Sequence, residues 1–154
     1  MLQRIQSVFL FIAVLLMLLM TIFPVWVYQP ENSDTVSVLT AFYFEQGGVK
    51  EFMPYTLIAV LAILSAIVGF IEIFKFKNRL LQMKLGTLNS LLMIGTLGLS
   101  FYFANELIEK FNLQLGWSYG MAVYFPPAAM LCNIMANRFI RKDEKLVRSV
   151  DRIR

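Results

Sequence analysis

Histidine is absent from the 154-residue chain, and Cys132 is its single cysteine. The usual general base near neutral pH and the commonest metal ligand are therefore missing. One cysteine cannot form an intrachain disulfide bond, and its apolar neighbours indicate an inert packing residue. The sequence also contains no glycine-rich phosphate loop before a helix, no cluster of metal ligands and no nucleophile beside a candidate base. We therefore expect neither enzymatic activity nor a bound cofactor.

Charged residues are scarce, at 16% against 58% apolar residues, and the mean hydropathy is +0.66. This composition argues against an ordinary soluble domain and favours a membrane protein. About 20 apolar residues in a helix cross a hydrocarbon core of about 30 Å. Four stretches have about this length, and they cover residues 5–27, 54–74, 85–103 and 117–136. The first resembles a signal peptide, but it ends in bulky aromatic residues instead of a small-residue cleavage site, which favours an uncleaved anchor.

The 14 lysine and arginine residues are distributed unevenly over these stretches. Lys50 and Lys110 lie in the segments after the first and third stretches. If the chain crosses a membrane four times, all the others lie on the opposite side, namely Arg4, Lys75, Lys77, Arg79, Lys84, Arg138, Arg141, Lys142, Lys145, Arg148, Arg152 and Arg154. Because cytoplasmic segments carry the excess of basic residues, the pattern predicts a multi-pass membrane protein with both termini in the cytoplasm. The net charge of +4 is then an orientation signal and does not indicate a specific nucleic acid partner.

The exterior segment between the first two stretches, residues 28–53, has the pattern of a small β-structure. Val36, Val38, Phe42 and Phe44 fall on one parity, and Gly47-Gly48 offers a tight turn. The pattern predicts a β-hairpin that lies on the helices, with an irregular loop as the alternative. The predicted fold is therefore a single domain over residues 1–154. It is an all-α membrane protein, a four transmembrane helix bundle with this small exterior hairpin and a cytoplasmic amphipathic C-terminal helix.

Few polar residues interrupt the four stretches, and these are the candidate site residues. Glu72 precedes Lys75 by three residues, so we expect its carboxylate to reach toward water and pair with Lys75 or a neighbouring basic residue; a proton relay is the alternative. Asn133 and Asn137 share one helix stripe, and Asn89 can hydrogen-bond toward that stripe from the third stretch. We interpret the asparagines as packing contacts between helices, with a substrate site as the alternative.

Two adjacent prolines, Pro126 and Pro127, lie within the fourth stretch. They remove two backbone donors, so the fourth helix should kink or locally unwind near Val123 and Tyr124. Broken helices hold ions or substrates in some transporters, but those proteins have paired repeats and convergent charges that this chain lacks. We interpret the prolines as structural.

The tail, residues 137–154, combines apolar residues at helical spacing with an excess of basic residues. This predicts an amphipathic helix, which anionic headgroups would hold at about 1 kcal/mol per nearby basic residue. Two interpretations stay open, an anchor on the membrane surface and a docking helix for a cytoplasmic partner. The candidate contact residues for both are Arg141, Lys142, Lys145, Leu146, Arg148, Val150 and Ile153.

Both ends of the chain resemble a known family. The opening Met1-Leu-Gln-Arg-Ile-Gln6 and the closing segment from Ala136 to Arg154, ANRFIRKDEKLVRSVDRIR, look like the ends of an uncharacterised bacterial inner-membrane family, domain-of-unknown-function family 4293. The resemblance covers the whole chain and implies a four-span membrane protein whose activity is not established. It supplies no catalytic residues.

The sequence favours an integral membrane protein that acts as a structural or accessory subunit and docks partners through its basic tail and exterior loop. The alternative is a lipid- or small-molecule-binding membrane module with a pocket between the third and fourth helices, near Asn89, Asn133 and Pro126. The candidate partners are anionic membrane lipids, a membrane or cytoplasmic protein, and a second copy of the chain.

Overall fold

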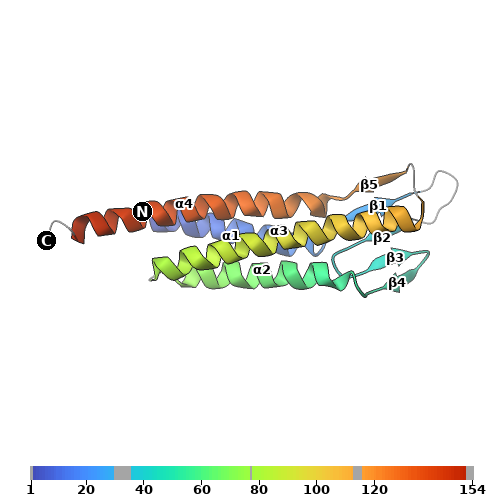
Figure 1. Cartoon of the computed structure of the whole chain (residues 1–154), viewed down its shortest axis with the longest axis horizontal. Coiled ribbons are helices and arrows are strands. Elements are labelled where there is room, and N and C mark those ends of the chain that lie inside the picture. The colour runs from blue at the N-terminus through green and yellow to red at the C-terminus, as the bar shows by residue number, and fades with distance from the viewer. Residues whose placement is uncertain (1, 30–35, 77, 113–115, 152–154) are drawn as a thin grey trace.

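A computed structural model gives an elongated molecule with helices along its length and a β-sheet at one end (Figure 1). It describes residues 2–29, 36–76, 78–112 and 116–151, without the side chains of residues 2–4 and 147–151. The helices are α1 (Leu2–Met20), α2 (Thr56–Phe74), α3 (Arg79–Lys110) and α4 (Phe125–Asp151), and a 3-10 helix, η1 (Met121–Tyr124), precedes α4. The strands are β1 (Trp26–Tyr28), β2 (Ser37–Leu39), β3 (Phe44–Gln46), β4 (Val49–Glu51) and β5 (Trp117–Tyr119).

The sheet has the strand order β4-β3-β2-β1-β5, and every neighbouring pair is antiparallel. Trp26 pairs with Leu39 on one side and with Tyr119 on the other, so β1 joins the segment after α1 to the segment before α4. β3 and β4 form a hairpin around the predicted Gly47-Gly48 turn. The φ angles of these glycines are 57° and 83°, which suit residues without a Cβ.

The four apolar residues of one parity do not share one buried face of the sheet. Ser37 and Leu39 on β2 face the core, whereas Val36 and Phe42 are 39% and 37% exposed. Phe44 is the one of the four that is buried. A shift of one residue in a strand exchanges its two faces, so the apolar parity alone does not identify the buried side of β2.

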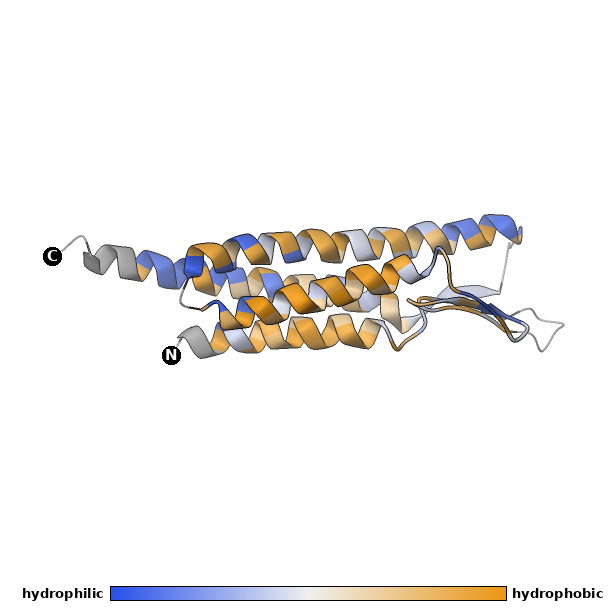
Figure 2. Ribbon diagram, turned by 90° about the horizontal axis from the view of Figure 1, so that it is seen from below, coloured by the Kyte–Doolittle hydropathy of each residue, from blue (hydrophilic) through white to orange (hydrophobic). Residues whose placement is uncertain are grey.

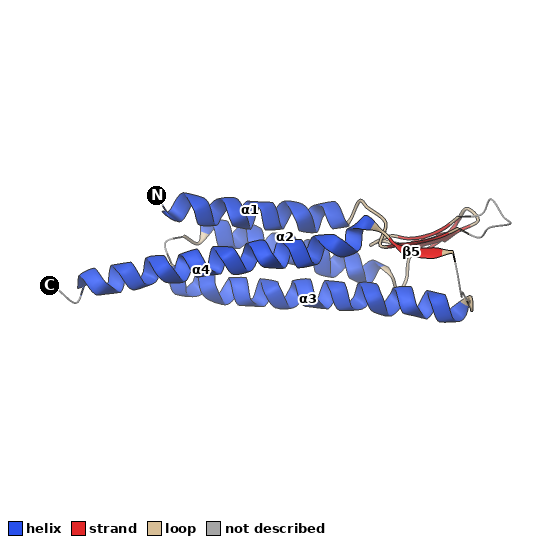
Figure 3. Ribbon diagram, turned by 90° about the horizontal axis from the view of Figure 1, so that it is seen from above, coloured by secondary structure: helices blue, strands red, loops and turns tan. Residues whose placement is uncertain are grey.

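The predicted all-α fold class is wrong, because a five-stranded antiparallel sheet makes the fold mixed α/β (Figure 3). The error has a physical cause, since an apolar run reads the same whether it forms a buried strand or a helix. Trp26 was assigned to the first helix and Trp117 to the fourth, but both lie in strands of this sheet. Pro24 lies between the end of α1 and β1, and it interrupts the helical run that hydropathy extended to residue 27.

The predicted bundle of four transmembrane helices is also wrong. Within the described part of the chain, α2 and α3 are the two helices that are long and apolar enough to cross a membrane. The described apolar stretch of α1, Ile5–Met20, is shorter than a full span. α4 begins only at Phe125 and carries basic residues from Arg138 onward, so its apolar portion is short. Two such helices are weak evidence of membrane association by themselves.

The four helices pack side by side, with α1 against α2 and α4, and α3 against α2 and α4. Small residues allow the close contacts. A Cβ on Gly69 would lie 2.9 Å from Cγ2 of Val14 on α1 and 3.1 Å from Nδ2 of Asn89 on α3, so α2 approaches both neighbours at this residue. The start of α1, the end of α4 and the α2–α3 turn all lie at the end away from the sheet (Figure 1).

Apolar side chains form the core and also cover the outside of the helices. Met17, Ile58 and Met93 are at most 1% exposed and belong to the core. Leu91 is 65%, Leu131 64% and Val8 57% exposed, and much of the helix ribbon has the colour of hydrophobic residues in Figure 2. Some polar residues are buried as well, namely Gln6, Ser37, Ser65, Glu72, Gln82, Asn89, Thr96, Ser100 and Asn133. Large exposed apolar patches are rare on an ordinary soluble domain.

Candidate functional site

Glu72 lies in the last turn of α2 and is completely buried. Neither of its carboxylate oxygens has a hydrogen-bond partner within the described residues. The expected reach toward water and pairing with Lys75 are therefore not found. A buried carboxylate without a partner is costly, because burial removes the water that solvates its charge.

Three further side chains from α3 and α4 lie close to Glu72 or to Gly86, the glycine beside it. The Gln82 side-chain amide donates to the Glu72 backbone carbonyl at 3.2 Å. The Cβ position of Gly86 lies 2.8 Å from Glu72 Oε1 and 2.6 Å from Asn137 Oδ1, so the absence of a side chain on Gly86 lets these two groups approach. Asn133 donates to the Gly86 carbonyl at 2.7 Å. We call Glu72, Gln82, Asn133 and Asn137 the Glu72 cluster.

Oxygen acceptors without donors are concentrated in the Glu72 cluster. Both Glu72 oxygens, Gln82 Oε1, Asn133 Oδ1 and Asn137 Oδ1 are buried and have no hydrogen-bond partner within the described residues. Gln6 on α1 adds another such oxygen at the same end of the bundle. Buried polar atoms are nearly always hydrogen-bonded, so an excess of acceptors from several helices needs a chemical explanation.

The predicted asparagine stripe faces α3. Asn133 is buried and donates to Ser90 Oγ at 2.9 Å as well as to Gly86, and Asn137 is half-buried beside Gly86. Asn89 lies on α3 but does not pair with either. Its Oδ1 accepts a hydrogen bond from Ser65 Oγ on α2 at 2.6 Å. The candidate asparagines therefore join α3 to both α2 and α4.

Pro126 and Pro127 lie in the first turn of α4 rather than in the middle of a helix. The expected local unwinding near Val123 and Tyr124 corresponds to η1, which precedes α4. Proline is well tolerated in a first helical turn, where the backbone N–H has no acceptor in the helix. These two residues set the start of α4 and do not contribute to the Glu72 cluster.

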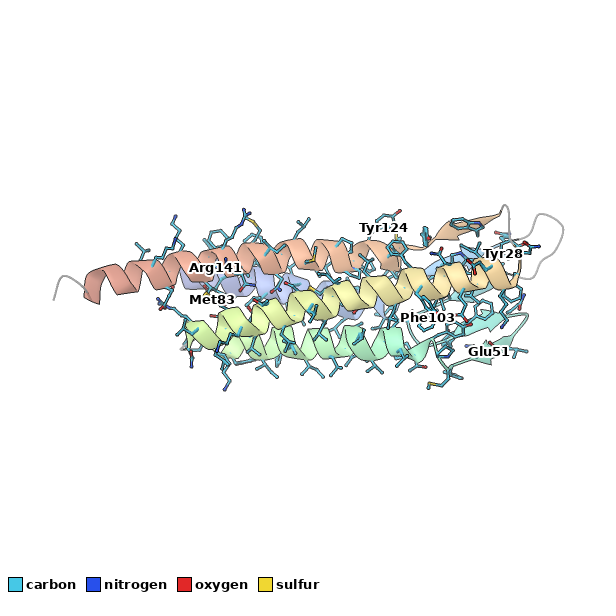
Figure 4. All side chains as sticks on the ribbon, viewed as in Figure 1. Tyr28, Glu51, Met83, Phe103, Tyr124 and Arg141 are labelled. Atoms are coloured by element: carbon cyan, nitrogen blue, oxygen red, sulfur yellow. The ribbon has the colours of Figure 1, made fainter. Side chains whose placement is uncertain are left out.

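A groove lies beside the cluster, along the surface of α3 and α4. Its polar part, of about 330 Å³, is lined by Thr87, Ser90, Ile134, Asn137, Arg138 and Arg141. Its apolar part, of about 540 Å³, is lined by Lys84, Thr87, Leu88, Ser90, Leu91 and Ile94. The two parts share Thr87 and Ser90, and we call them together the α3–α4 groove. Arg141 and Met83 lie near the end of the bundle opposite the sheet (Figure 4).

The described tail contacts lie on α4, and Arg141 among them also lines the α3–α4 groove. Arg141, Lys142 and Lys145 are exposed, and Leu146 is 51% exposed. The side chains of Arg148 and Val150, and all of Ile153, lie outside the described residues. Arg79 at the start of α3 forms an ion pair with Asp143 at 3.2 Å and donates to the Asp143 carbonyl at 3.0 Å. This contact fixes α4 to the α2–α3 turn.

Sequence reasoning did not select Gln82, Ser65 or Gly86 as a joint site. Gln82 falls in the segment between the second and third stretches, which was interpreted as a short cytoplasmic turn. The missed signal is a periodicity, because the buried face of α3 repeats at three- and four-residue spacing. That face consists of Gln82, Gly86, Asn89, Met93, Thr96, Ser100, Phe103, Ala104 and Leu107.

The chemistry of the site follows from the side chains that the described residues bring together. Among the described residues, no group of three or more His, Cys, Asp or Glu side chains is placed to hold a metal ion. The Glu72 cluster offers one carboxylate and several amide oxygens, which are hard ligands. The α3–α4 groove offers guanidinium donors next to an apolar surface. Such groups bind and orient ligands without needing bond-making chemistry.

Comparison with known proteins identifies the family of the chain but not an activity. None of the curated proteins compared with it matches. The model of a family described as "Domain of unknown function (DUF4293)" matches residues 2–153, which is nearly the whole chain. The resemblance of the two chain ends is thereby confirmed, and the chain belongs to this family of unknown function.

Proposed function

We propose that the chain is a non-enzymatic, lipid-binding accessory protein of the bacterial inner membrane, and that its α3–α4 groove holds an anionic phospholipid. The proposal rests on the arrangement of the lining residues, because basic residues line one part of the groove and apolar residues line the other. Arg138 and Arg141 line the polar part, and a guanidinium group binds phosphate oxygens in a bidentate manner. Leu91 and Ile94 line the apolar part, which suits an acyl chain.

The distribution of apolar surface supports a membrane location. Exposed leucine, isoleucine and phenylalanine side chains cover the helices, while buried amide and carboxyl groups lie between them. A bilayer stabilises such an exterior, and the intrahelical hydrogen bonds satisfy the backbone of α2 and α3 inside it. We propose that α2 and α3 cross the membrane as a hairpin and that α1 and α4 pack alongside.

The distribution of charge supports an orientation for this hairpin. Arg79, Lys84 and Arg141 belong to the end with the α2–α3 turn, whereas Lys50 and Lys110 belong to the end with the sheet. The positive-inside rule then assigns the α2–α3 turn and both termini to the cytoplasm. In this orientation the basic part of the α3–α4 groove faces the headgroups of the inner leaflet, and its apolar part faces the acyl chains.

Lipid binding can be tested by native mass spectrometry of the full chain extracted in a mild detergent. We expect bound phosphatidylglycerol or cardiolipin in excess over their share of the membrane lipids. The double variant Arg138→Gln/Arg141→Gln should reduce this occupancy at least about tenfold, because each charge-assisted hydrogen bond contributes about 1.5 to 3 kcal/mol. The control Lys142→Gln/Lys145→Gln removes the same charge from residues that do not line the groove. Equal losses in the two double variants, or lipids bound only in bulk proportion, would contradict the proposal.

The orientation can be tested by cysteine labelling in a Cys132→Ala background. Glu51 on β4 and Lys145 on α4 are exposed and belong to opposite ends of the molecule. We expect Glu51→Cys to react with a membrane-impermeant maleimide in intact spheroplasts and Lys145→Cys to react only after the membrane is opened. Labelling of both residues in intact spheroplasts would contradict a membrane-crossing hairpin with this orientation.

Docking of a protein partner is a second candidate function, favoured by the length of α4. This helix continues past the other helices at the end away from the sheet (Figure 1). Its exposed Lys142 and Lys145 present charge there, and the Arg79–Asp143 pair holds the helix in place. The double variant Lys142→Gln/Lys145→Gln should release any stoichiometric partner seen in a mild-detergent pull-down while leaving lipid occupancy of the groove unchanged.

A further inference from the structure

We propose that the Glu72 cluster binds a small monovalent cation, with Na⁺ as the physiological class of ligand. This inference concerns a different ligand from the lipid of the α3–α4 groove, and Asn137 is the residue that belongs to both the groove lining and the Glu72 cluster. It rests on the buried carboxylate of Glu72 and on the amide oxygens of Gln82, Asn133 and Asn137, which have no hydrogen-bond partners within the described residues.

The first step is the imbalance between acceptors and donors. Glu72 contributes two buried oxygens, and Gln82, Asn133 and Asn137 contribute one each, all without hydrogen-bond partners within the described residues. The amide donors of Gln82 and Asn133 are directed elsewhere, to the Glu72 and Gly86 carbonyls and to Ser90. Asn137 also brings its amide nitrogen against Gly86, but the atoms of the cluster that are left without partners are all acceptor oxygens. A bound cation satisfies several acceptors at once.

The second step is charge. Glu72 is completely buried, and within the described part of the chain no lysine or arginine forms an ion pair with it. An uncompensated carboxylate at this depth is strongly destabilising, and one positive charge neutralises it. A divalent ion would leave an excess positive charge in the same buried space. The balance therefore favours a monovalent ion.

The third step is the chemistry of the ligands. The cluster contains no thiolate and no imidazole, so it does not favour soft or borderline transition metals. Carboxylate and amide oxygens are the ligands of hard cations. Glu72 Oε1 and Asn137 Oδ1 both lie within 2.8 Å of the Cβ position of Gly86, which shows that oxygens from α2 and α4 converge on one small volume.

An ion at this site would connect three helices. Glu72 belongs to α2, Gln82 and Gly86 to α3, and Asn133 and Asn137 to α4. Ligand binding to the folded state stabilises it by mass action. At a hundredfold excess over the dissociation constant, the thermal midpoint of a chain of this size should rise by about 5 to 10 °C.

The experiment measures thermal unfolding of the full chain in detergent with NaCl, KCl, LiCl or choline chloride at equal ionic strength. We expect one small cation to raise the midpoint saturably over choline. Glu72→Gln should abolish this dependence, because its amide supplies donors in place of the carboxylate charge. The matched control Glu106→Gln removes an exposed carboxylate on α3 and should keep the full response.

A second variant and a direct measurement keep the test decisive if Glu72→Gln does not fold. Asn137→Ala removes one oxygen and should weaken the saturation midpoint at least about tenfold. Scintillation proximity with ²²Na⁺ should show saturable binding to the unmodified chain.

Identical midpoints in all four salts, or equal responses of Glu72→Gln and Glu106→Gln, would overturn the proposal. A midpoint that responds to pH but not to any cation would assign a proton to Glu72 instead. Retained cation response in Arg138→Gln/Arg141→Gln would separate this site from the groove.

Discussion

The closest contact between helices in the Glu72 cluster is at Gly86, and adding one methyl group there perturbs it directly. In Gly86→Ala the new Cβ would contact the side-chain amide nitrogen of Asn137, and it would lie 2.6 Å from Asn137 Oδ1 and 2.8 Å from Glu72 Oε1. Real Cβ atoms do not tolerate such distances, so α3 must move away from α4 or the buried side chains must leave their positions. Gly98 provides a matched control, because it lies on the same helix and a Cβ there has no neighbour within 4 Å.

The expected change in unfolding free energy follows from two opposing contributions. Replacing glycine by alanine within a helix contributes about 0.5 to 1 kcal/mol of stability through the backbone, and this term is common to Gly86→Ala and Gly98→Ala. Overpacking costs about 1 to 3 kcal/mol and applies only to Gly86→Ala. The difference in unfolding free energy between the two variants should therefore be about 1 to 3 kcal/mol, which corresponds to about 3 to 10 °C in thermal midpoint.

Thermal unfolding in detergent, followed by near-ultraviolet circular dichroism, measures this difference. Gly98→Ala should unfold slightly above the unmodified chain, and Gly86→Ala should unfold about 3 to 10 °C below Gly98→Ala. Adding Asn137→Ala to Gly86→Ala should recover part of the loss, with a coupling energy of about 0.5 to 3 kcal/mol in the double-mutant cycle. If Gly86→Ala is as stable as Gly98→Ala, or if Asn137→Ala brings no recovery, α3 and α4 do not make contact at this residue and the geometry of the Glu72 cluster is wrong.

Three further predictions concern contacts between the helices. Ser65→Ala leaves Asn89 Oδ1 without its 2.6 Å hydrogen bond, so the thermal midpoint should fall by about 2 to 4 °C; an unchanged midpoint would mean that α2 and α3 do not use this bond. Asn133→Leu removes two hydrogen bonds to α3 and should cost about 1 to 2 kcal/mol in the same assay, whereas a neutral result would place Asn133 outside the packed interface. Arg79→Gln breaks the partly buried ion pair with Asp143, so trypsin should cleave the end of α4 faster, and equal cleavage rates would show that the pair does not hold this helix.

The sequence predicted a local turn correctly but did not predict the sheet that contains it. The glycines at Gly47-Gly48 gave the correct turn, because two residues with positive φ are a strong local requirement. The sheet that contains this turn was not predicted, since β1 and β5 are short strands inside apolar runs that also suit helices. Their pairing joins Trp26 to Tyr119, which are distant in the sequence, and no local pattern encodes such a contact.

The failed prediction for Glu72 has a specific structural reason. The expected Glu72–Lys75 pair assumes that both residues lie on one continuous helix. α2 ends at Phe74, and Lys75 is the residue that caps it, with its backbone N–H bonded to the carbonyls of Ile71 and Glu72. Glu72 is completely buried whereas Lys75 is exposed, so the two side chains lie in different environments although they are three residues apart. The packing of α3 and α4 against α2 decides whether the carboxylate reaches water, and the local sequence pattern contains no information about that packing.

The Glu72 cluster could not be predicted because it depends on how far neighbouring antiparallel helices are shifted along their axes. Periodicity identified a polar face on α4 and a buried asparagine on α3, but it contained no information about which turn of one helix lies beside which turn of the next. Three contacts fix those shifts, Ser65 with Asn89, Gly86 with Asn133, and Arg79 with Asp143. They align the end of α2 with the first turns of α3 and the second half of α4. Glu72 then lies beside Gln82 of α3 and Asn137 of α4, and the same alignment that buries its carboxylate supplies oxygen ligands for the proposed cation.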